Sequence, residues 1–281
     1  MIRSIAIFQN YCALNSKPVL SAVRTSAHKR GIEILDDSRD ADALLIWSVL
    51  WAGRMAPNQL LYQHYRALQR PVIVIDVGAL RRNHTWKIAL NHITAEGRYG
   101  HKSNLDWDRP NKLGVKLENS VGGDRILIAC QHSGSLQMEQ WPNTESWINS
   151  VIESVKQNSD RPIVVRPHPR SRIDARLINY KIDLEYPNRI KNTYDDFDLM
   201  MNWHAVVNHT SGPGIHAAMA NVRPVVHHTS LAAPVGCNFA NIEDAYTADR
   251  EKWFVELCHT EYTVPEIEQG RWIERLFDEQ D

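Results

Sequence analysis

Two stretches of the sequence place residues suited to phosphate binding at the ends of predicted strands. From Trp203 to Val226 the chain reads WHAVVNHTSGPGIHAAMANVRPVV. This pattern predicts a strand over 205–207, a turn of small and hydroxyl residues, a helix of small residues and a second strand. Such a turn leaves backbone N–H groups at the positive end of the helix, where they can bind phosphate. An ordinary connection without a ligand is the alternative, because glycine-containing turns of this kind are common.

The second stretch, RPIVVRPHPRSR, runs from Arg161 to Arg172. It predicts a buried strand over 163–165 that is followed by cationic side chains and two prolines. Ligands of open α/β sheets bind at the carboxyl ends of the strands, and guanidinium groups match phosphate oxygens in a bidentate way. A solvated basic edge is the alternative. The cationic residues are Arg166, His168, Arg170 and Arg172.

Alternating strands and helices position these residues, which predicts an α/β fold with mostly parallel, doubly wound sheets. The predicted strands cover residues 4–8, 43–47, 72–75, 125–129, 163–165 and 205–207. The predicted helices cover residues 19–30, 59–68, 145–157, 249–257 and 266–279, and a further short helix begins within 194–198. Gly31 is the expected C-cap of the first helix and Thr144 the expected N-cap of the third.

The two stretches together resemble a known class of enzyme. A strand ending in R-P-H-P, followed by the turn N-H-T-S-G-P-G and a strand R-P-V-V, resembles the C-terminal domain of GT-B-fold glycosyltransferases. The run from Asp124 to Arg170 is similar to bacteriophage glycosyltransferases that modify hydroxymethylated DNA bases, and more distantly to capsule-type sugar transferases. The resemblance covers about residues 124 to 230.

This resemblance implies two Rossmann-like domains of the GT-B type with a cleft between them. We expect an acceptor domain over 1–118, a donor domain over 119–258, and a C-terminal helix within 259–281 that packs back on the first domain. The resemblance makes Arg166, His168, Thr210, Ser211 and Gly212 the expected contacts to the diphosphate of a sugar nucleotide. Gln131, His132, Ser133, Arg170 and Gly214 belong to the same expected donor site.

Asp76 is the predicted catalytic base, because it comes just past the predicted strand 72–75, beside a glycine, and faces the expected substrate crevice. Such a carboxylate can take the proton of an acceptor hydroxyl as its oxygen attacks the sugar. His84 is the fallback, and a helix cap or a partner for a nearby arginine is the alternative role of Asp76. The expected acceptor contacts are Arg54, Arg81, Arg82, Lys102 and Trp107.

Two other patterns could indicate a metal site. Asp106-Trp107-Asp108 is a literal D-x-D, but it falls in a polar, turn-rich stretch rather than at the end of a strong strand. Five histidines lie between residues 204 and 228, at spacings that fit no standard zinc arrangement. We therefore predict that no metal is required.

The composition is that of a globular protein: 43% of the 281 residues are hydrophobic and 23% are charged. The net charge of −1 lacks the basic excess of many strong nucleic-acid binders, although one local basic patch remains compatible with DNA binding. The four cysteines are widely separated, which suggests reduced thiols. No apolar run is long enough to span a bilayer, so we expect a cytoplasmic protein without a membrane partner, in the host cell if a phage encodes it.

The resemblance implies an inverting glycosyltransferase, and we expect a hexosyl- or pentosyltransferase that uses a UDP-sugar. The phage-like resemblance favours 5-hydroxymethylcytosine in DNA as the acceptor. A capsule or lipopolysaccharide transferase is one alternative, and a non-catalytic module that binds a sugar nucleotide or a glycan is another.

Overall fold

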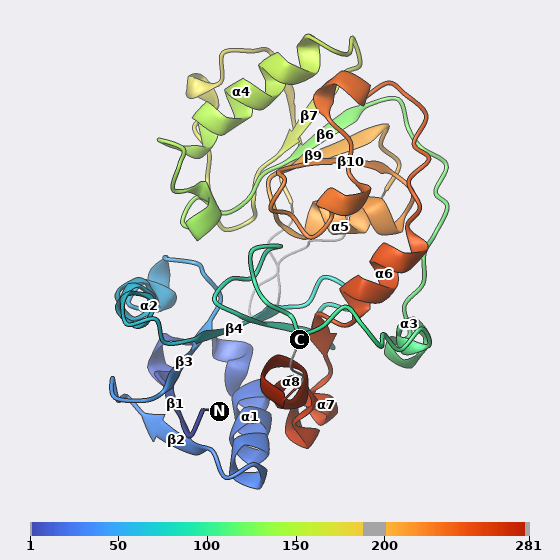
Figure 1. The fold of residues 1–281 in the computed structure, drawn as a ribbon. Helices are drawn as coiled ribbons and strands as arrows, with labels where there is room; N and C mark the ends of the chain where they lie inside the picture. Colours follow the sequence, from blue (N-terminus) through green and yellow to red (C-terminus); the bar gives the residue numbers. More distant parts are fainter. Residues whose placement is uncertain (1, 188–200, 279–281) are drawn as a thin grey trace. The chain divides into compact units, whose positions relative to one another are not determined.

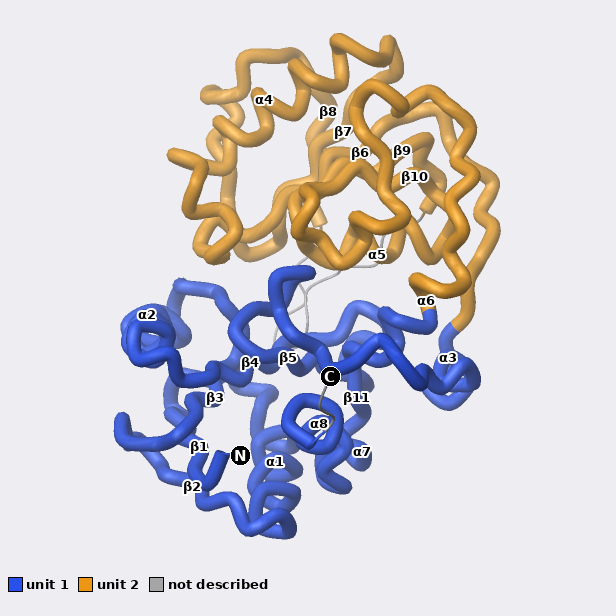
Figure 2. Tube along the Cα trace, viewed as in Figure 1, with its two compact units in different colours: residues 1–115, 255–281 blue, residues 116–254 orange. Residues whose placement is uncertain are grey.

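A computed structural model describes residues 2–187 and 201–278 (Figure 1). The short helix predicted to begin within 194–198 lies outside the described residues. The chain forms two compact units (Figure 2). Unit 1 comprises residues 1–115 and 255–281, and unit 2 comprises residues 116–254.

Unit 1 is built on a six-stranded sheet with the order β11-β5-β4-β3-β1-β2. β1, β2, β3 and β4 are parallel, whereas β5 runs antiparallel to β4 and β11 antiparallel to β5. Neither antiparallel strand was predicted: β5 follows the loop over residues 78–85, and β11 comes from the distant C-terminal part. The strands are β1 (Ser4–Ile7), β2 (Glu33–Asp36), β3 (Ala43–Trp47), β4 (Val72–Val77), β5 (Trp86–Leu90) and β11 (Glu261–Tyr262).

The helices of unit 1 include two predicted ones, α1 (Lys17–Lys29) and α2 (Asn58–Ala67). The single helix predicted over 266–279 is wrong. The structure forms α7 (Val264–Gln269), α8 (Arg271–Ile273) and a π turn (Glu274–Asp278) instead. Gly270 has φ of 85°, and a left-handed residue ends an α-helix. α1 packs beside α7 over one face of the sheet, where the main core of the unit lies (Figure 1).

Unit 2 contains a five-stranded parallel sheet with the order β10-β9-β6-β7-β8. Strand residues of one face of the sheet pack with α4 (Thr144–Lys156) in one core, and the alternate strand residues pack with α5 (Gly212–Met219) in another. Helices therefore cover both faces, as in a doubly wound sheet. The strands are β6 (Ile126–Ala129), β7 (Ile163–Arg166), β8 (Asp183–Leu184), β9 (Ala205–Asn208) and β10 (Arg223–Val226).

Two short helices complete the fold, α3 (Arg109–Leu113) and α6 (Glu251–Cys258). The N-cap predicted for α4 is off by one residue: Asn143, rather than Thr144, accepts a hydrogen bond from the backbone N–H of Ser146 at 2.7 Å. None of the helices in the described ranges has both the length and the apolar character that a membrane span requires. The chain is thus an α/β protein of two Rossmann-like units, as the sequence predicts.

Candidate functional site

The sheet of unit 2 reverses its strand order between β6 and β9. The chain passes from β6 to β7 on one side, and then returns to place β9 on the other side of β6. Ligands of such sheets bind beyond the carboxyl ends of the strands at this point. The loops that follow the two strands are joined there by Gln131, whose side-chain oxygen accepts hydrogen bonds from the Thr210 backbone N–H (3.1 Å) and hydroxyl (3.0 Å).

Helix α5 begins beside this bond and its first turn is not capped by a side chain. Ser211 is the N-cap residue, and its side chain makes no capping hydrogen bond. Instead the Asn208 side-chain amide donates to the Ser211 hydroxyl oxygen (2.9 Å) and to the backbone oxygen of Ala129 (2.8 Å). The Ser211 hydroxyl hydrogen therefore stays available to an outside acceptor. The first N–H groups of a helix have no partner within the helix, so this terminus suits an anion such as phosphate.

The glycines of the predicted turn differ in what they do. A Cβ on Gly214 would lie 2.6 Å from the Val226 side chain and 3.5 Å from the Asn208 side-chain oxygen. Gly214 is therefore required for the close approach of α5 to the sheet. A Cβ on Gly212 would meet nothing nearer than the His216 ring, at 3.7 Å. Gly212 leaves its part of the turn open.

His132 and His168 lie close together after β6 and β7, with ring centroids 5.1 Å apart. The Nδ1 atom of His132 accepts the Gly134 N–H (3.0 Å), and the Nδ1 atom of His168 accepts the Arg170 N–H (3.1 Å). A neutral ring in this arrangement carries its proton on Nε2, and the Nε2–H group of His132 can donate to a ligand. Burial, and to a smaller extent the Arg170 charge, lower the pKa of His132, which favours its neutral form.

The same two loops are tied together by serines. The Ser133 backbone N–H donates to the Ser171 hydroxyl oxygen (3.1 Å), and the Ser171 hydroxyl donates to the Ser133 hydroxyl (2.9 Å). Ser171 is buried, whereas Ser133 is exposed. This link fixes the path of the two loops relative to each other.

Arg166 has a partner of its own within the protein. Its guanidinium group forms an ion pair with Glu185, which follows β8, the strand beyond β7 from the switch point. The guanidinium side chain is 12% exposed, and the backbone N–H of Glu185 bonds to the Val165 oxygen at 3.0 Å. Arg170, in contrast, is exposed. A phosphate contact of either arginine stays a prediction.

A pair of stacked histidines was not predicted as a unit. His209 follows β9 and His227 follows β10, and their rings lie parallel with centroids 4.6 Å apart. The pairing of β9 with β10 explains this contact. Asn208 lies opposite Val226, so the histidines that follow them, His209 and His227, must lie next to each other. Burial, followed by the charges of His227 and His228, lowers the pKa of His209 to about 4. Its Nε2 atom lies 3.1 Å from the Gln140 side-chain amide.

In unit 1, Asp76 is held near the carboxyl end of β4, within the strand rather than just past it as predicted. Its carboxyl oxygens accept the Ser48 hydroxyl (3.0 Å) and the Val77 backbone N–H (2.7 Å). Burial raises the pKa of Asp76, while the charge of Lys87 opposes this effect most strongly. A carboxylate with a raised pKa is suited to act as a general base.

The other residues predicted for unit 1 contact different parts of the chain. Lys102 forms an ion pair with Glu256 at 3.0 Å, and an Arg81 guanidinium nitrogen donates to the Leu113 oxygen at 3.1 Å. Arg82 is close enough for its charge to act on Asp76. Exposed side chains remain at Arg54, His84 and Trp107, the last of them 62% exposed beside α3.

Both carboxylates of the D-x-D pattern interact with other residues of the protein. Asp106 forms an ion pair with Lys112 at 2.6 Å and also accepts the Asp108 backbone N–H at 3.1 Å. Asp108 in turn accepts the Asn111 side-chain amide at 2.9 Å. Within residues 2–187 and 201–278, no group of three or more His, Cys, Asp or Glu side chains is placed to hold a metal ion.

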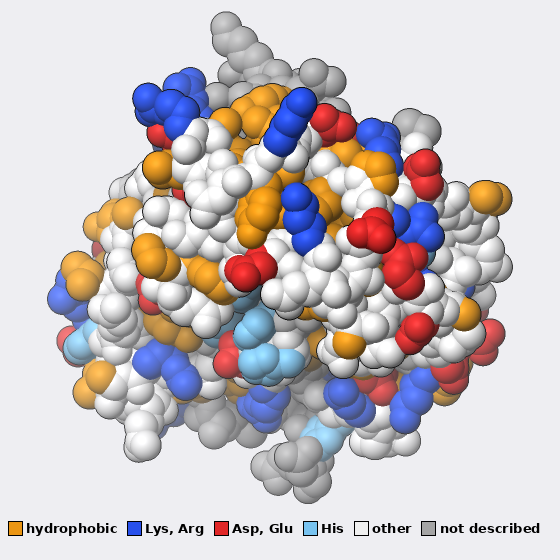
Figure 3. Space-filling model, turned by 90° about the horizontal axis from the view of Figure 1, so that it is seen from above, with side chains coloured by type: hydrophobic (Ala, Val, Ile, Leu, Met, Phe, Trp, Pro, Cys, Tyr) orange, Lys and Arg blue, Asp and Glu red, His pale blue; other side chains and the backbone are white. Residues whose placement is uncertain are grey.

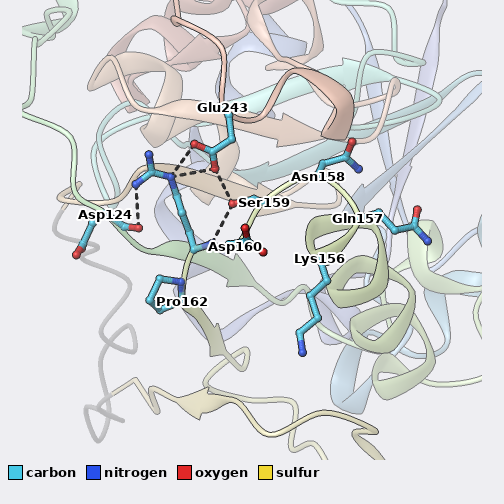
Figure 4. Close-up of a pocket in the computed structure, with 9 residues that line it drawn as sticks. Asp124, Lys156, Gln157, Asn158, Ser159, Asp160, Pro162 and Glu243 are labelled. Carbon is cyan, nitrogen blue, oxygen red and sulfur yellow. Dashed lines mark hydrogen bonds and ion pairs between the residues drawn. The ribbon is translucent and has the colours of Figure 1, made fainter.

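A pocket of about 620 Å³ lies at the opposite, amino edge of the unit 2 sheet (Figure 4). It is lined by the turn after α4, by Asp124 and by Glu243. Polar groups at the pocket bind one another: the Arg161 guanidinium donates to Glu243 at 2.9 Å and to the Asp124 backbone oxygen at 3.2 Å (Figure 4). We therefore interpret this pocket as a structural feature of the turn.

No known protein family and no curated protein matches the sequence. In structure, the chain is similar to the KpsC β-Kdo 2,4-transferase of Thermosulfurimonas dismutans, with a TM-score of 0.51, 10% identity, and coverage of 96% of this chain and 98% of that chain. It is also similar to the KpsC β-Kdo 2,7-transferase of the same organism, with a TM-score of 0.51, 11% identity, and coverage of 96% and 99%. At these identities the comparisons show a shared fold. The chain therefore has the GT-B type of fold, over nearly its whole described length.

Proposed function

We propose that this chain is a glycosyltransferase that binds a nucleotide-sugar donor at the carboxyl edge of the unit 2 sheet. The observation that carries the proposal is the Gln131–Thr210 bond across the switch point, beside the uncapped start of α5. A diphosphate placed there would accept from the helix N–H groups and from the Ser211 hydroxyl. His132 would add a neutral Nε2–H donor from the loop after β6, and His168, whose ring lies beside it, is the predicted contact from the loop after β7.

In the proposed reaction the acceptor oxygen attacks the anomeric carbon of the sugar, with inversion. The bond between that carbon and the diphosphate oxygen breaks, and the diphosphate leaves with the electron pair. Asp76 takes the proton of the acceptor hydroxyl. The start of α5 stabilises the negative charge that builds on the leaving group, which is the main way such a site lowers the barrier. This scheme uses no metal ion.

The donor base and the acceptor are finer parts of the proposal. The sequence resemblance supports a UDP-sugar, and 5-hydroxymethylcytosine in DNA as the acceptor. The fold shared with two Kdo transferases supports a capsule-type glycan acceptor instead. On the face shown in Figure 3, Lys and Arg side chains are interspersed with Asp and Glu rather than gathered in one basic field. Because of the shared fold and the net charge of −1, we favour the glycan acceptor, with modified DNA as the second candidate.

Donor binding tests the proposal without knowledge of the acceptor. Calorimetry with a panel of nucleotides and nucleotide sugars should show binding, which Thr210→Val weakens at least tenfold, or about 1.4 kcal/mol. Thr25→Val on α1 is the matched control and should bind like the wild type. No binding of any nucleotide to the wild type would overturn the proposal. Equal binding by Thr210→Val would remove the switch-point loop from the site.

The role of Arg166 requires a paired experiment because of its ion pair. If Arg166 contacts the diphosphate, Arg166→Ala weakens nucleotide binding at least tenfold, while Glu185→Ala leaves it unchanged or stronger. If Arg166 only supports β8, both substitutions have the same modest effect. The comparison of the two dissociation constants separates these roles.

A further inference from the structure

Four polar residues form a row across the sheet of unit 1. Ser48 follows β3 beside Asp76 of β4, Asp76 lies opposite Lys87 of β5, and Lys87 lies opposite Glu261 of β11. Residues opposite each other in register lie on the same face of a sheet, with Cβ atoms about 5 Å apart. Figure 2 shows that β4, β5 and β11 follow one another in this unit. We call these four residues the polar row.

The two carboxylates of the polar row have hydrogen-bond donors of their own. Glu261 is fully buried and accepts the Ala79 backbone N–H (2.6 Å), the Leu80 backbone N–H (3.2 Å) and the Thr85 hydroxyl (2.6 Å). Asp76 accepts from Ser48 and from the Val77 N–H. Neither carboxylate therefore needs a direct bond from Lys87.

Lys87 is only half-buried, and its side chain forms no hydrogen bond or ion pair with another residue in the described part of the chain. Its position between two carboxylates is thus not explained by a fixed contact. Its charge still acts through space on Asp76, which lies directly opposite. An opposite charge at this range favours the ionised form of a carboxyl group.

The other groups around Asp76 act in both directions. Arg82, in the turn after β4, also favours the carboxylate, whereas burial opposes it. Glu261 adds a negative charge from β11. The Tyr99 hydroxyl, after β5, is buried, and burial with the charges of Glu261 and Asp76 raises the pKa of Tyr99. Ser48 brings no charge, and the basic residues of α2, His64 and Arg66, are in its last turn, at the far end of the strands.

We propose that Lys87 is a positioning residue for the reaction: its ammonium group, opposite Asp76, holds the Asp76 carboxylate ionised so that it can accept the proton of the acceptor hydroxyl. This inference rests on the proposed function, because it assigns Lys87 a task in that reaction. Lys87 does not touch the reacting atoms. After transfer the proton leaves Asp76 for the solvent, and Lys87 remains charged throughout.

The test is the pH dependence of three variants. Lys87→Met keeps the apolar stem and removes the charge, so the acid limb of the kcat profile should move up by about one pH unit. Lys87→Arg should restore the wild-type profile. Lys252→Met removes an exposed lysine of α6 and should also leave the profile unchanged. An unshifted acid limb in Lys87→Met, or no rescue by arginine, would overturn the proposal.

A second readout keeps this inference distinct from the proposed function. The Asp76 carboxyl carbon can be titrated by NMR in the wild type and in Lys87→Met, with Asp76→Asn to assign the signal. The titration midpoint should rise in Lys87→Met whether or not a substrate is known. An unchanged midpoint would refute the role of Lys87, and a raised midpoint in a protein without transferase activity would refute only the proposed function.

Discussion

Asp76 combines burial with access to hydrogen-bond donors. Burial makes its charged form costly, and the bonds from Ser48 and from the Val77 N–H recover part of that cost. Ser48 reaches Asp76 from a left-handed backbone conformation, with φ of 62°. Such conformations are costly for residues other than glycine and concentrate at functional sites. At the scale of single residues, Asp76 and Ser48 are therefore the most informative pair of unit 1.

Replacing Asp76 should separate stability from activity. Asp76→Asn can still accept the Val77 N–H through its one oxygen and can donate its amide to the Ser48 hydroxyl. It cannot take a proton, so transfer should fall by roughly 10² to 10⁴ while donor binding persists. The folded-state pKa of Asp76 is raised, so its stabilising effect is present at low pH and is lost as pH rises through that pKa. Asp76→Asn should therefore melt at a higher temperature than the wild type at pH 7. A lower melting temperature, or full activity, would contradict this account of Asp76.

His209 should make the protein sensitive to acid. Its pKa in the fold is about 4, below the ordinary value of 6.5, so the unfolded chain binds more protons than the folded chain between these values. Stability is thus lost as pH falls from 6.5 towards 4. In His209→Leu the free energy of unfolding should drop less between pH 7 and 4.5, by roughly 2 to 3 kcal/mol. Denaturant unfolding at several pH values measures this slope, and His28→Leu, which removes an exposed histidine, should keep the wild-type slope.

At the scale of elements, the packing of α5 on the sheet depends on one glycine. Gly214→Ala should lower the free energy of unfolding by about 1 to 3 kcal/mol, because the new methyl group would meet the Val226 side chain at 2.6 Å. Gly212→Ala, two residues earlier, has its nearest neighbour at 3.7 Å and should leave stability unchanged or slightly higher. Denaturant unfolding of Gly214→Ala and Gly212→Ala measures this difference in stability. Equal stabilities would show that α5 can move away from β10 at no cost.

The short strand β11 joins the C-terminal part of the chain to the turn after β4. Glu261→Gln replaces one acceptor oxygen by an N–H₂ group, which leaves a buried donor unsatisfied at a cost of about 1 to 3 kcal/mol. Glu256→Gln breaks only the pair with the exposed Lys102 and should cost at most about 1 kcal/mol. Thermal melting compares the two variants. A larger loss in Glu256→Gln would contradict this assignment of the buried carboxylate.

Apolar runs and helical periodicity correctly predicted several strands and helices. Strand 43–47 and the centres of α1, α2 and α4 follow directly from apolar runs and periodicity. β2 was missed because half of its residues are acidic and none is buried, and β11 because only pairing with β5 makes it a strand. Gly270 was the overlooked signal for the break between α7 and α8.

The candidate site, too, could be predicted only in part from the sequence. The sequence predicted that the loops after β6, β7 and β9 share one edge of a sheet, and the structure brings Gln131 and Thr210 into contact there. Strand register, which the sequence did not specify, decides that His209 stacks on His227. The partner of Arg166 depends on β8, a two-residue strand without a clear sequence signature.

At the scale of the whole molecule, the two units carry different parts of the proposed reaction. Unit 2 holds the switch point and the start of α5, which suit a diphosphate, and unit 1 holds Asp76 and the polar row. The structural similarity to two Kdo transferases covers both units, since it includes 96% of this chain. In the proposed reaction, donor binding depends on unit 2, and proton transfer depends on Asp76 of unit 1.

The most direct test of this account is acceptor-dependent release of nucleotide from a panel of nucleotide sugars, UDP-sugars among them, with chelator present. The acceptors are a Kdo-containing glycan and DNA that carries 5-hydroxymethylcytosine, each compared with no acceptor. We predict release that requires one acceptor, persists in chelator and disappears in Asp76→Asn. Release that Asp76→Asn does not affect would contradict the assignment of the base, and no release from any donor and acceptor pair would contradict the assignment as a glycosyltransferase.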